Sequence, residues 1–180
     1  MAMREIILPE TKPALEWING RVVQKVSPQR KHALAQTTFA AALNAWARLA
    51  GSGMVGTEWN FQIAPPGEER RPLVPDVAFL SYELLPYSVQ LETEVPRIAP
   101  DVAVEILSPD DRLKDVEEKV RVYLASGTRA VVLVDTAEQI VTIHETAGSL
   151  RLDRFDVFQH DSLPGFNMPV IDLFTPPQPK

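Results

Sequence analysis

The chain has 180 residues, 45% hydrophobic and 23% charged, a composition typical of one globular domain with a substantial core. It contains no cysteine, which excludes disulfide bonds, zinc–thiolate sites and a cysteine nucleophile. The formal net charge of −6 argues against a protein that coats nucleic acid non-specifically, but not against a nuclease that confines its positive charge to one cleft.

The sequence predicts neither a secretory signal at its N-terminus nor a membrane-spanning helix. Met1-Ala2-Met3-Arg4-Glu5 leads into only a short apolar run, so we expect no secretory signal. No apolar run approaches the ~20 residues that a spanning helix needs. We therefore expect a cytoplasmic protein with one domain over residues 1–180 and a frayed, proline-rich tail at 175–180.

The first predicted elements are a β-hairpin and a long helix. Residues 15–18 and 21–26 flank Asn19-Gly20, the strongest two-residue turn signal. Ser27-Pro28 is typical of a helix N-cap, and the helix should run to about Ala50 before the stop at Gly51. Its expected buried stripe consists of Phe39, Leu43, Trp46 and Ala50, and His32 falls on the same face.

Two strands and a long connection are expected next. Residues 57–63 alternate apolar and polar side chains, as in a half-buried strand, and residues 73–81 form the next strand, which contains Asp76. The connection over residues 82–98 is longer than most in a compact domain. We expect it to be a mobile flap or a substrate loop.

Residues 100–108 read as a strand with two acids on one face. Successive side chains alternate, so Asp101 and Glu105 point one way while the opposite face is apolar. An acid in the middle of such a strand is costly to bury unless it is paired or binds a cation. The apolar face consists of Val102, Val104 and Ile106.

A second helix and further strands complete the pattern. Ser108-Pro109-Asp110-Asp111 should cap a helix over residues 112–126, whose core stripe is expected at Leu113, Val116, Val120 and Leu124. Lys119 then lies at the inner edge of the buried face. Residues 130–134 predict a central strand joined to the previous one by a crossover, and residues 139–155 predict a hairpin. This order indicates an α/β fold, with a mixed sheet flanked by helices.

Asp76, Glu105 and Lys119 form the candidate catalytic set. Carboxylates on neighbouring strands suit Mg²⁺, and a lysine beside the ion can activate water or stabilise the negative charge on the phosphate group as it reacts. The alternative is that Asp76 and Asp101 only order turns after prolines, and that Lys119 forms a surface pair with Asp115.

The sequence resembles the Uma-two family of restriction endonucleases, in the PD-(D/E)XK nuclease superfamily. The resemblance rests on Pro75-Asp76-Val77-Ala78-Phe79, on the strand over residues 100–109, and on Lys119, Tyr123, Gly127 and Val132-Leu133-Val134-Asp135. Leu15-Glu16-Trp17-Ile18-Asn19-Gly20 and His32 match the start of the family, and Leu163-Pro164-Gly165-Phe166 matches its end. It covers nearly the whole chain.

The resemblance implies a restriction-endonuclease-like fold, here with an extra N-terminal hairpin and C-terminal strands. It implies DNA as substrate and Mg²⁺ or Mn²⁺ held by Asp76 and Glu105 with the backbone carbonyl of Ile106. We expect a homodimer, because a nuclease that cuts both strands often works as a dimer. The superfamily's lysine normally lies two positions after the second acid, where this chain has Leu107. The resemblance suggests that Lys119 supplies the amine instead.

Several further residues have two possible roles. His32 could contact phosphate or a metal-bound water, or could bond only to backbone. Glu16 could complete the acidic cluster or face solvent, and Asp101 is expected to support the site. Tyr123 is expected in the core. The basic residues expected near DNA are Arg70, Arg71 and Arg112.

Three functions follow from this interpretation. The first is a Mg²⁺-dependent endonuclease with Asp76, Glu105 and Lys119 as catalytic residues. The second is a catalytically inactive binding or regulatory module on a nuclease scaffold, which the acidic charge and the displaced lysine favour. The third is a metal-dependent hydrolase of another phosphoester.

Overall fold

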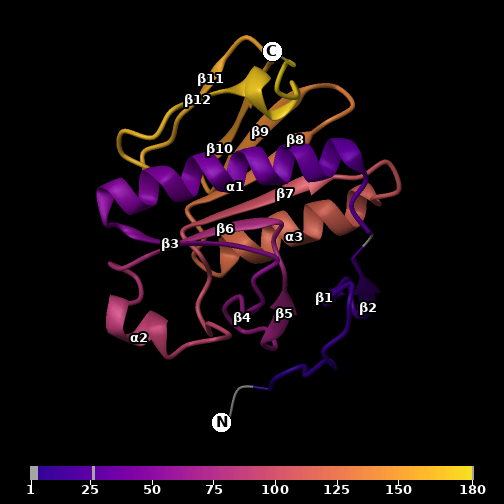
Figure 1. Cartoon of the computed structure of the whole chain (residues 1–180). Coiled ribbons are helices and arrows are strands. Elements are labelled where there is room, and N and C mark those ends of the chain that lie inside the picture. The colour runs from indigo at the N-terminus through magenta and orange to yellow at the C-terminus, as the bar shows by residue number, and fades with distance from the viewer. Residues whose placement is uncertain (1–3, 26, 180) are drawn as a thin grey trace.

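Figure 1 shows the computed structural model of the protein, which describes residues 4–25 and 27–179. Its centre is a six-stranded sheet with the strand order β10–β9–β8–β7–β6–β3. β7 and β8 run parallel, and every other neighbouring pair in this sheet is antiparallel. These strands are β3 (Gly53–Thr57), β6 (Val77–Ser81), β7 (Val102–Leu107), β8 (Ala130–Asp135), β9 (Ile140–Glu145) and β10 (Gly148–Leu152). The predicted mixed sheet is confirmed.

Three short two-stranded sheets and the helices surround this sheet. The pairs are β1 (Leu15–Ile18) with β2 (Arg21–Gln24), β4 (Phe61–Ile63) with β5 (Arg71–Leu73), and β11 (Val157–Phe158) with β12 (Met168–Pro169). The helices are α1 (Arg30–Ala50), α2 (Tyr87–Leu91), α3 (Leu113–Ala125) and the 3-10 helix η1 (Val170–Leu173). No helix in the described ranges is long and apolar enough to cross a membrane.

The large sheet is covered on both faces, by α1 on one and by α3 on the other (Figure 1). Alternation along each strand produces two cores: Val102, Val104 and Ile106 pack on the α1 side, while Ala103 packs on the α3 side. The C-terminal segment joins the α1 core, and β1, β4 and β5 join the α3 core. The predicted alternation of β7 is confirmed.

The N-terminal hairpin forms as predicted, with positive φ at Asn19 (50°) and Gly20 (73°) in its turn. Strand β2 ends at Gln24. Of the residues named in the predictions, Val26, Met1 to Met3 and Lys180 lie outside the described ranges. The hairpin of β9 and β10 also forms as predicted.

Helix α1 ends as predicted but begins later. Gly51 adopts φ 59° at the C-cap, whereas the N-cap is Gln29 and not Ser27, and no side chain caps the first turn. Ala47 rather than Ala50 completes the buried stripe, because Ala50 lies in the exposed last turn.

Helix α3 packs on the sheet with part of the predicted stripe, but not with its first residue. Leu113 is 72% exposed, whereas Val120 and Leu124 pack against the core beside the buried Lys119, Val122 and Tyr123. Asp111 does not cap this helix, because its Oδ2 accepts the N–H of Ser108 and orders the preceding turn instead. The helix is therefore turned so that a lysine and a tyrosine face the sheet.

Backbone irregularities break two of the predicted strands. Glu58 takes φ 51°, so the strand predicted over residues 57–63 becomes the end of β3, a turn and β4. The strand predicted over 73–81 is divided between β5 and β6, and Asp76 lies in the gap. The sequence did not predict β3. The connection over residues 82–98 contains α2, whose Gln90 amide donates to the carbonyls of Leu80, Ser81 and Leu85.

Candidate active site

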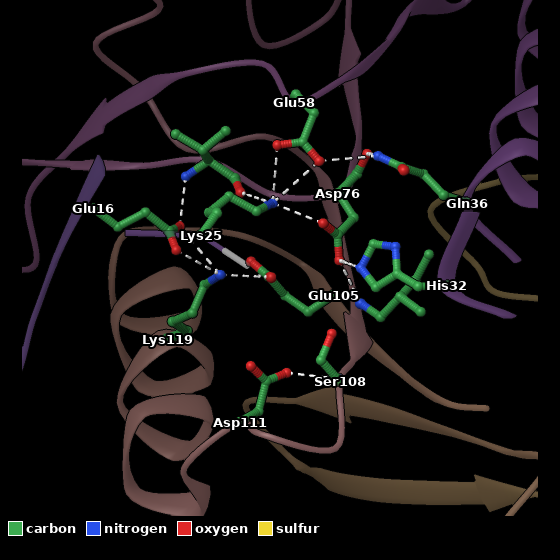
Figure 2. Close-up of polar contacts among 12 residues, drawn as sticks. Glu16, Lys25, His32, Gln36, Glu58, Asp76, Glu105, Ser108, Asp111 and Lys119 are labelled. Atoms are coloured by element: carbon green, nitrogen blue, oxygen red, sulfur yellow. Dashed lines mark hydrogen bonds and ion pairs between the residues drawn. The ribbon is translucent and has the colours of Figure 1, made fainter. Parts of the chain in front are cut away.

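The candidate active site lies at the end of the β6–β7 ladder, where the two strands stop pairing. Their ladder ends at the pair of Val77 and Val104, and one step further along this register Asp76 lies across from Glu105. By strand alternation both carboxylates project to the α3 side, as Ala78 on β6 does. The two predicted acids therefore share one face at the end of the ladder, as Figure 2 shows.

Both oxygens of the Asp76 carboxylate are engaged. Oδ2 accepts the backbone N–H of Ile106 at 2.6 Å and lies 3.3 Å from Nε2 of His32, in the first turn of α1. Oδ1 lies 2.7 Å from Nζ of Lys25, which follows β2. The Asp76 side chain thus completes the hydrogen bonding of β7 where β6 no longer can.

Lys119 of α3 lies between two buried carboxylates. Its Nζ is 2.5 Å from Oε2 of Glu105 and 3.1 Å from the carboxylate of Glu16 on β1. The other oxygen of Glu105 accepts the Tyr123 hydroxyl at 3.1 Å, and Glu16 accepts the backbone N–H of Val74 at 2.8 Å. Glu105 is therefore fixed from two sides by α3.

Lys25 anchors the opposite side of Asp76. Its ammonium lies 2.8 Å from the carbonyl oxygen of Val74 and 3.2 Å from Oε2 of Glu58. Gln36 on α1 braces the same corner by donating to the carbonyl oxygen of Asp76 at 2.9 Å and to Glu58 at 3.0 Å. Each predicted acid is thus paired with its own lysine.

Burial and neighbouring charge act in opposite directions on the charged groups. Burial raises the pKa of Glu105 to about 7; Lys119 opposes this rise, while the charges of Glu16 and Asp76 add to it. Burial would also raise the pKa of Asp76, but the hydrogen bond from His32 and the charges of Lys25 and Lys119 hold it well below its usual range. Asp76 is therefore ionised, whereas the raised pKa of Glu105 makes its carboxyl the more easily protonated of the two.

The basic groups keep their protons. Burial favours the neutral amine of Lys119 and of Lys25, yet the neighbouring carboxylates outweigh burial and raise the pKa of both ammoniums. Burial also favours the neutral imidazole of His32, but the Asp76 carboxylate outweighs this effect and raises the pKa of the imidazole.

These groups line a cleft of about 210 Å³ that opens between the hairpin and α3. A cavity needs only about 10–15 Å³ of such volume to hold one water, so the cleft has room for a hydrated ion or a phosphate group. Its mouth carries Arg21, Asp110, Asp111, Arg112 and Asp115.

A family model described as "Putative restriction endonuclease", Uma2, matches residues 4–171. The chain belongs to this family. Among solved structures, the chain is similar to one described as a putative nuclease belonging to DUF820 from Anabaena variabilis ATCC 29413. The two share 27% sequence identity over 93% of each chain, with a TM-score of 0.81. No curated protein matches the chain.

In this Uma2 chain the structure brings together five of the six residues predicted for the site. Asp76, Glu105, Lys119, His32 and Glu16 all line the cleft. Glu16 is 3% exposed, so the alternative in which it faces solvent is wrong. The surface pair of Lys119 with Asp115 is also wrong, because Asp115 bonds Arg21 and Asn19.

Asp101 is the predicted supporting residue that lies elsewhere. It sits before the start of β7, four residues or about 13 Å along the strand from Glu105. Its Oδ2 accepts the N–H of Ser81 at 2.7 Å, and its Oδ1 lies 3.5 Å from Nε of Arg129. Asp101 therefore orders the opposite end of the sheet.

Of the arginines expected near DNA, only Arg112 lines the cleft. Arg71 is 8% exposed, and its guanidinium pairs with Glu68 and Glu118. Arg70 donates to the carbonyl oxygens of Gln62 and Arg97. Arg70 and Arg71 therefore hold the β4–β5 region together.

The oxygens at the end of β7 fit a hard divalent ion. In the described part of the chain, no three His, Asp or Glu side chains group closely enough to hold a metal by themselves. In a strand, the N–H and the carbonyl of one residue point to the same edge of the strand. The N–H of Ile106 points to Asp76, so the carbonyl oxygen of Ile106 also points to the Asp76 side of β7. Asp76, Glu105 and this carbonyl suit Mg²⁺, which needs few protein oxygens and keeps several waters.

Lys25 and Glu58 belong to the site but were not predicted from the sequence. Lys25 follows an ordinary edge strand, and Glu58 lies in a segment that was interpreted as continuous strand. Only the positive φ of Glu58 turns its carboxylate toward the site, and nothing local in the sequence signals that conformation.

Proposed function

We propose that this protein is a divalent-metal-dependent nuclease that hydrolyses phosphodiester bonds in DNA. The convergence of Asp76, Glu105 and Lys119 on one cleft supports the proposal most directly. Membership of the Uma2 family and the similarity to a structure described as a putative nuclease point the same way.

Asp76, Glu105 and the carbonyl of Ile106 would hold Mg²⁺ or Mn²⁺. The ion would supply a Lewis acid and lower the pKa of a bound water. Asp76 is suited to this role because it stays ionised and is oriented by Ile106 and His32. Glu105 would release its proton when the ion binds, as ligand carboxylates must.

Lys119 would hold its ammonium close to Glu105 and toward the attacking water or the phosphate. A fixed cation in a partly dry cleft stabilises the charge that develops during phosphoryl transfer. Glu16 positions Lys119 through the contact at 3.1 Å. His32 positions Asp76 through the contact at 3.3 Å.

The test is cleavage of supercoiled plasmid and of duplex oligonucleotides with Mg²⁺ or Mn²⁺. We expect the wild type to nick or linearise the plasmid, and Asp76→Asn and Glu105→Gln to lose at least about 10²-fold in rate. Asp101→Asn removes a buried carboxylate outside the cleft and is the matched control. Equal activity of all four proteins, or none in the wild type, contradicts the proposal.

The second candidate is a binding or regulatory module without catalysis. The observation that favours it is that both acids are already paired with lysines and that Leu107 replaces the usual lysine. Calorimetry separates the candidates: the nuclease binds millimolar Mg²⁺ or Mn²⁺ and loses this binding in Glu105→Gln, whereas the module binds neither ion. A homodimer would let a nuclease reach both strands, and sedimentation with duplex DNA tests it.

A further inference from the structure

The ammonium of Lys25 lies among oxygens of the kind that bind metal ions. One side-chain carboxylate, one backbone carbonyl and a second carboxylate surround it, at 2.7 Å (Asp76 Oδ1), 2.8 Å (Val74 O) and 3.2 Å (Glu58 Oε2). The Lys25 side chain is only 11% exposed. Hard divalent cations use the same oxygen types in proteins.

The two lysines of the site lie on opposite flanks of the acid pair. Lys119 bonds Glu105 and Glu16, whereas Lys25 bonds Asp76 and Glu58 (Figure 2). Neither ammonium bonds both Asp76 and Glu105. The space that these two acids share with the Ile106 carbonyl is therefore distinct from the place that Lys25 fills.

The charges of this network leave room for one divalent ion. Glu16, Glu58, Asp76 and Glu105, when ionised, carry four negative charges, while Lys25 and Lys119 carry two positive charges and a protonated His32 adds a third. The remainder is one negative charge with His32 protonated and two with it neutral. One Mg²⁺ or Mn²⁺ brings the net charge to between zero and +1, whereas a second ion would leave a buried excess of two or three positive charges.

We propose that Lys25 is a built-in cation that takes the place of a second metal ion, so that the site works with one divalent ion per chain. Two-metal nucleases hold their ions about 3.5–4 Å apart on a shared carboxylate. Here Asp76 is the shared group, with Lys25 on its Oδ1. This inference rests on the proposed metal-dependent function and specifies its metal stoichiometry.

The competing explanation is an ordinary ion pair that only holds the hairpin against β6. Such a pair would cost stability when it is removed, but it would leave metal binding unchanged. A built-in cation predicts more: without its charge, the oxygens of Val74, Asp76 and Glu58 become available to an added ion. The number of bound ions therefore separates the two explanations.

The experiment counts bound Mn²⁺ by electron paramagnetic resonance and calorimetry in the full chain. We expect one ion in the wild type and two in Lys25→Met, with spin coupling between the two. Affinity for the first ion should rise by about tenfold or more in Lys25→Met, because a unit charge a few ångströms away is gone. Lys114→Met, which removes an exposed lysine from α3, should match the wild type.

A double variant makes the test specific. The double variant Lys25→Met with Glu58→Gln loses one positive and one negative charge, so the net charge of the site stays as in the wild type. It also loses the Glu58 carboxylate that the second ion would need, so it should bind one Mn²⁺ again. Two ions in the wild type, or one ion with wild-type affinity in Lys25→Met, overturn the inference. No bound ion in any of these proteins overturns the proposed function itself.

A measurement on the wild type guards against a Lys25→Met protein that fails to fold. Nitrogen-15 NMR of lysine ammonium groups reports whether Lys25 keeps its hydrogen bonds. We expect its signal to persist in slow exchange with solvent when Mg²⁺ saturates the site. Loss of that signal on metal binding shows that the ion displaces Lys25, and it overturns the inference.

Discussion

Nζ of Lys119 lies 2.5 Å from Oε2 of Glu105, although fourteen residues of chain separate the two positions. The crossover from β7 to β8 carries α3 over the face of the sheet to which Glu105 points. Leu107, where the superfamily's lysine normally stands, also lines the cleft. A lysine on the helix thus reaches the carboxylate that a lysine on the strand would otherwise reach.

Replacement of Lys119 by methionine should damage both stability and activity. Lys119→Met leaves Glu105 and Glu16 buried together without a cation, and breaking a buried pair in this way costs about 3–5 kcal/mol. Turnover should fall by about 10²-fold. Urea unfolding with a chelator present measures the first effect, and plasmid cleavage measures the second.

The double variant Lys119→Met with Glu105→Gln separates the two effects. It removes one of the two unpaired carboxylates, so we expect most of the lost unfolding free energy to return. Activity should not return, because both proposed catalytic groups are gone. An unfolding free energy for Lys119→Met equal to that of the wild type would show that the pair contributes no stability.

Much of this site could be predicted because strand alternation is a local property. The pattern of residues 100–108 gave the faces of β7, and the two Pro-Asp strands indicated neighbouring acids. The placement of Lys119 followed from helical spacing. Each of these predictions depends on side-chain direction within one element.

Contacts made by irregular backbone could not be predicted in the same way. Asp101 and Glu105 share a face, but only the sheet topology shows that Asp101 belongs to the other end. Lys25 reaches Asp76 because the hairpin packs beside β5, a long-range event that no local pattern encodes. Arg71 was expected near DNA, but its guanidinium pairs with Glu118, which is distant in the sequence, and with Glu68, which lies in a loop.

The raised pKa of Glu105 predicts a pH-dependent stability of the metal-free protein. The carboxyl has a pKa near 4.5 when unfolded and about 7 when folded, so the folded state binds the extra proton between these values. Its contribution to stability is therefore present at low pH and is lost as the pH rises from about 4.5 to 7. Metal affinity should rise over the same range, because the ion must displace this proton.

Glu105→Gln isolates this contribution. Glutamine does not titrate, so the free energy of unfolding of the variant relative to the wild type should increase by about 2–3 kcal/mol between pH 5 and pH 8. Urea denaturation with a chelator at the two pH values measures it. A difference between the two proteins that is the same at both pH values would refute the assignment.

His32 should titrate above its ordinary range because of Asp76. Its contribution to stability is then fully present below about pH 6.5 and is lost as the pH rises through the raised pKa of the folded protein. Proton NMR should give a midpoint above 6.5 in the metal-free wild type and a lower one in Asp76→Asn. His144, whose pKa burial lowers, is an internal control that Asp76→Asn should not move.

Arg112 is the arginine best placed to meet a DNA backbone. It is exposed at the mouth of the cleft, directly before α3, while Arg71 is buried against two glutamates. Arg112→Ala should weaken DNA binding severalfold and reduce the slope of log affinity against log salt by about one, as expected for one lost phosphate contact. Fluorescence anisotropy at several salt concentrations, with Ca²⁺ in place of Mg²⁺, measures both quantities.

Two other arginines provide controls for the effect of Arg112→Ala on DNA binding. Arg154→Ala removes an equal charge from the far loop beside Phe155, so it should leave the salt slope unchanged. Arg71→Ala should lower the unfolding free energy, because Glu68 and Glu118 lose the more buried of the two arginines that pair with both, while DNA affinity stays at the wild-type level. If Arg112→Ala and Arg154→Ala changed the slope equally, the cleft mouth would not be the place where this protein meets DNA. The net charge of the whole chain is −6, so the local placement of cations, and not the total charge, must account for any DNA binding.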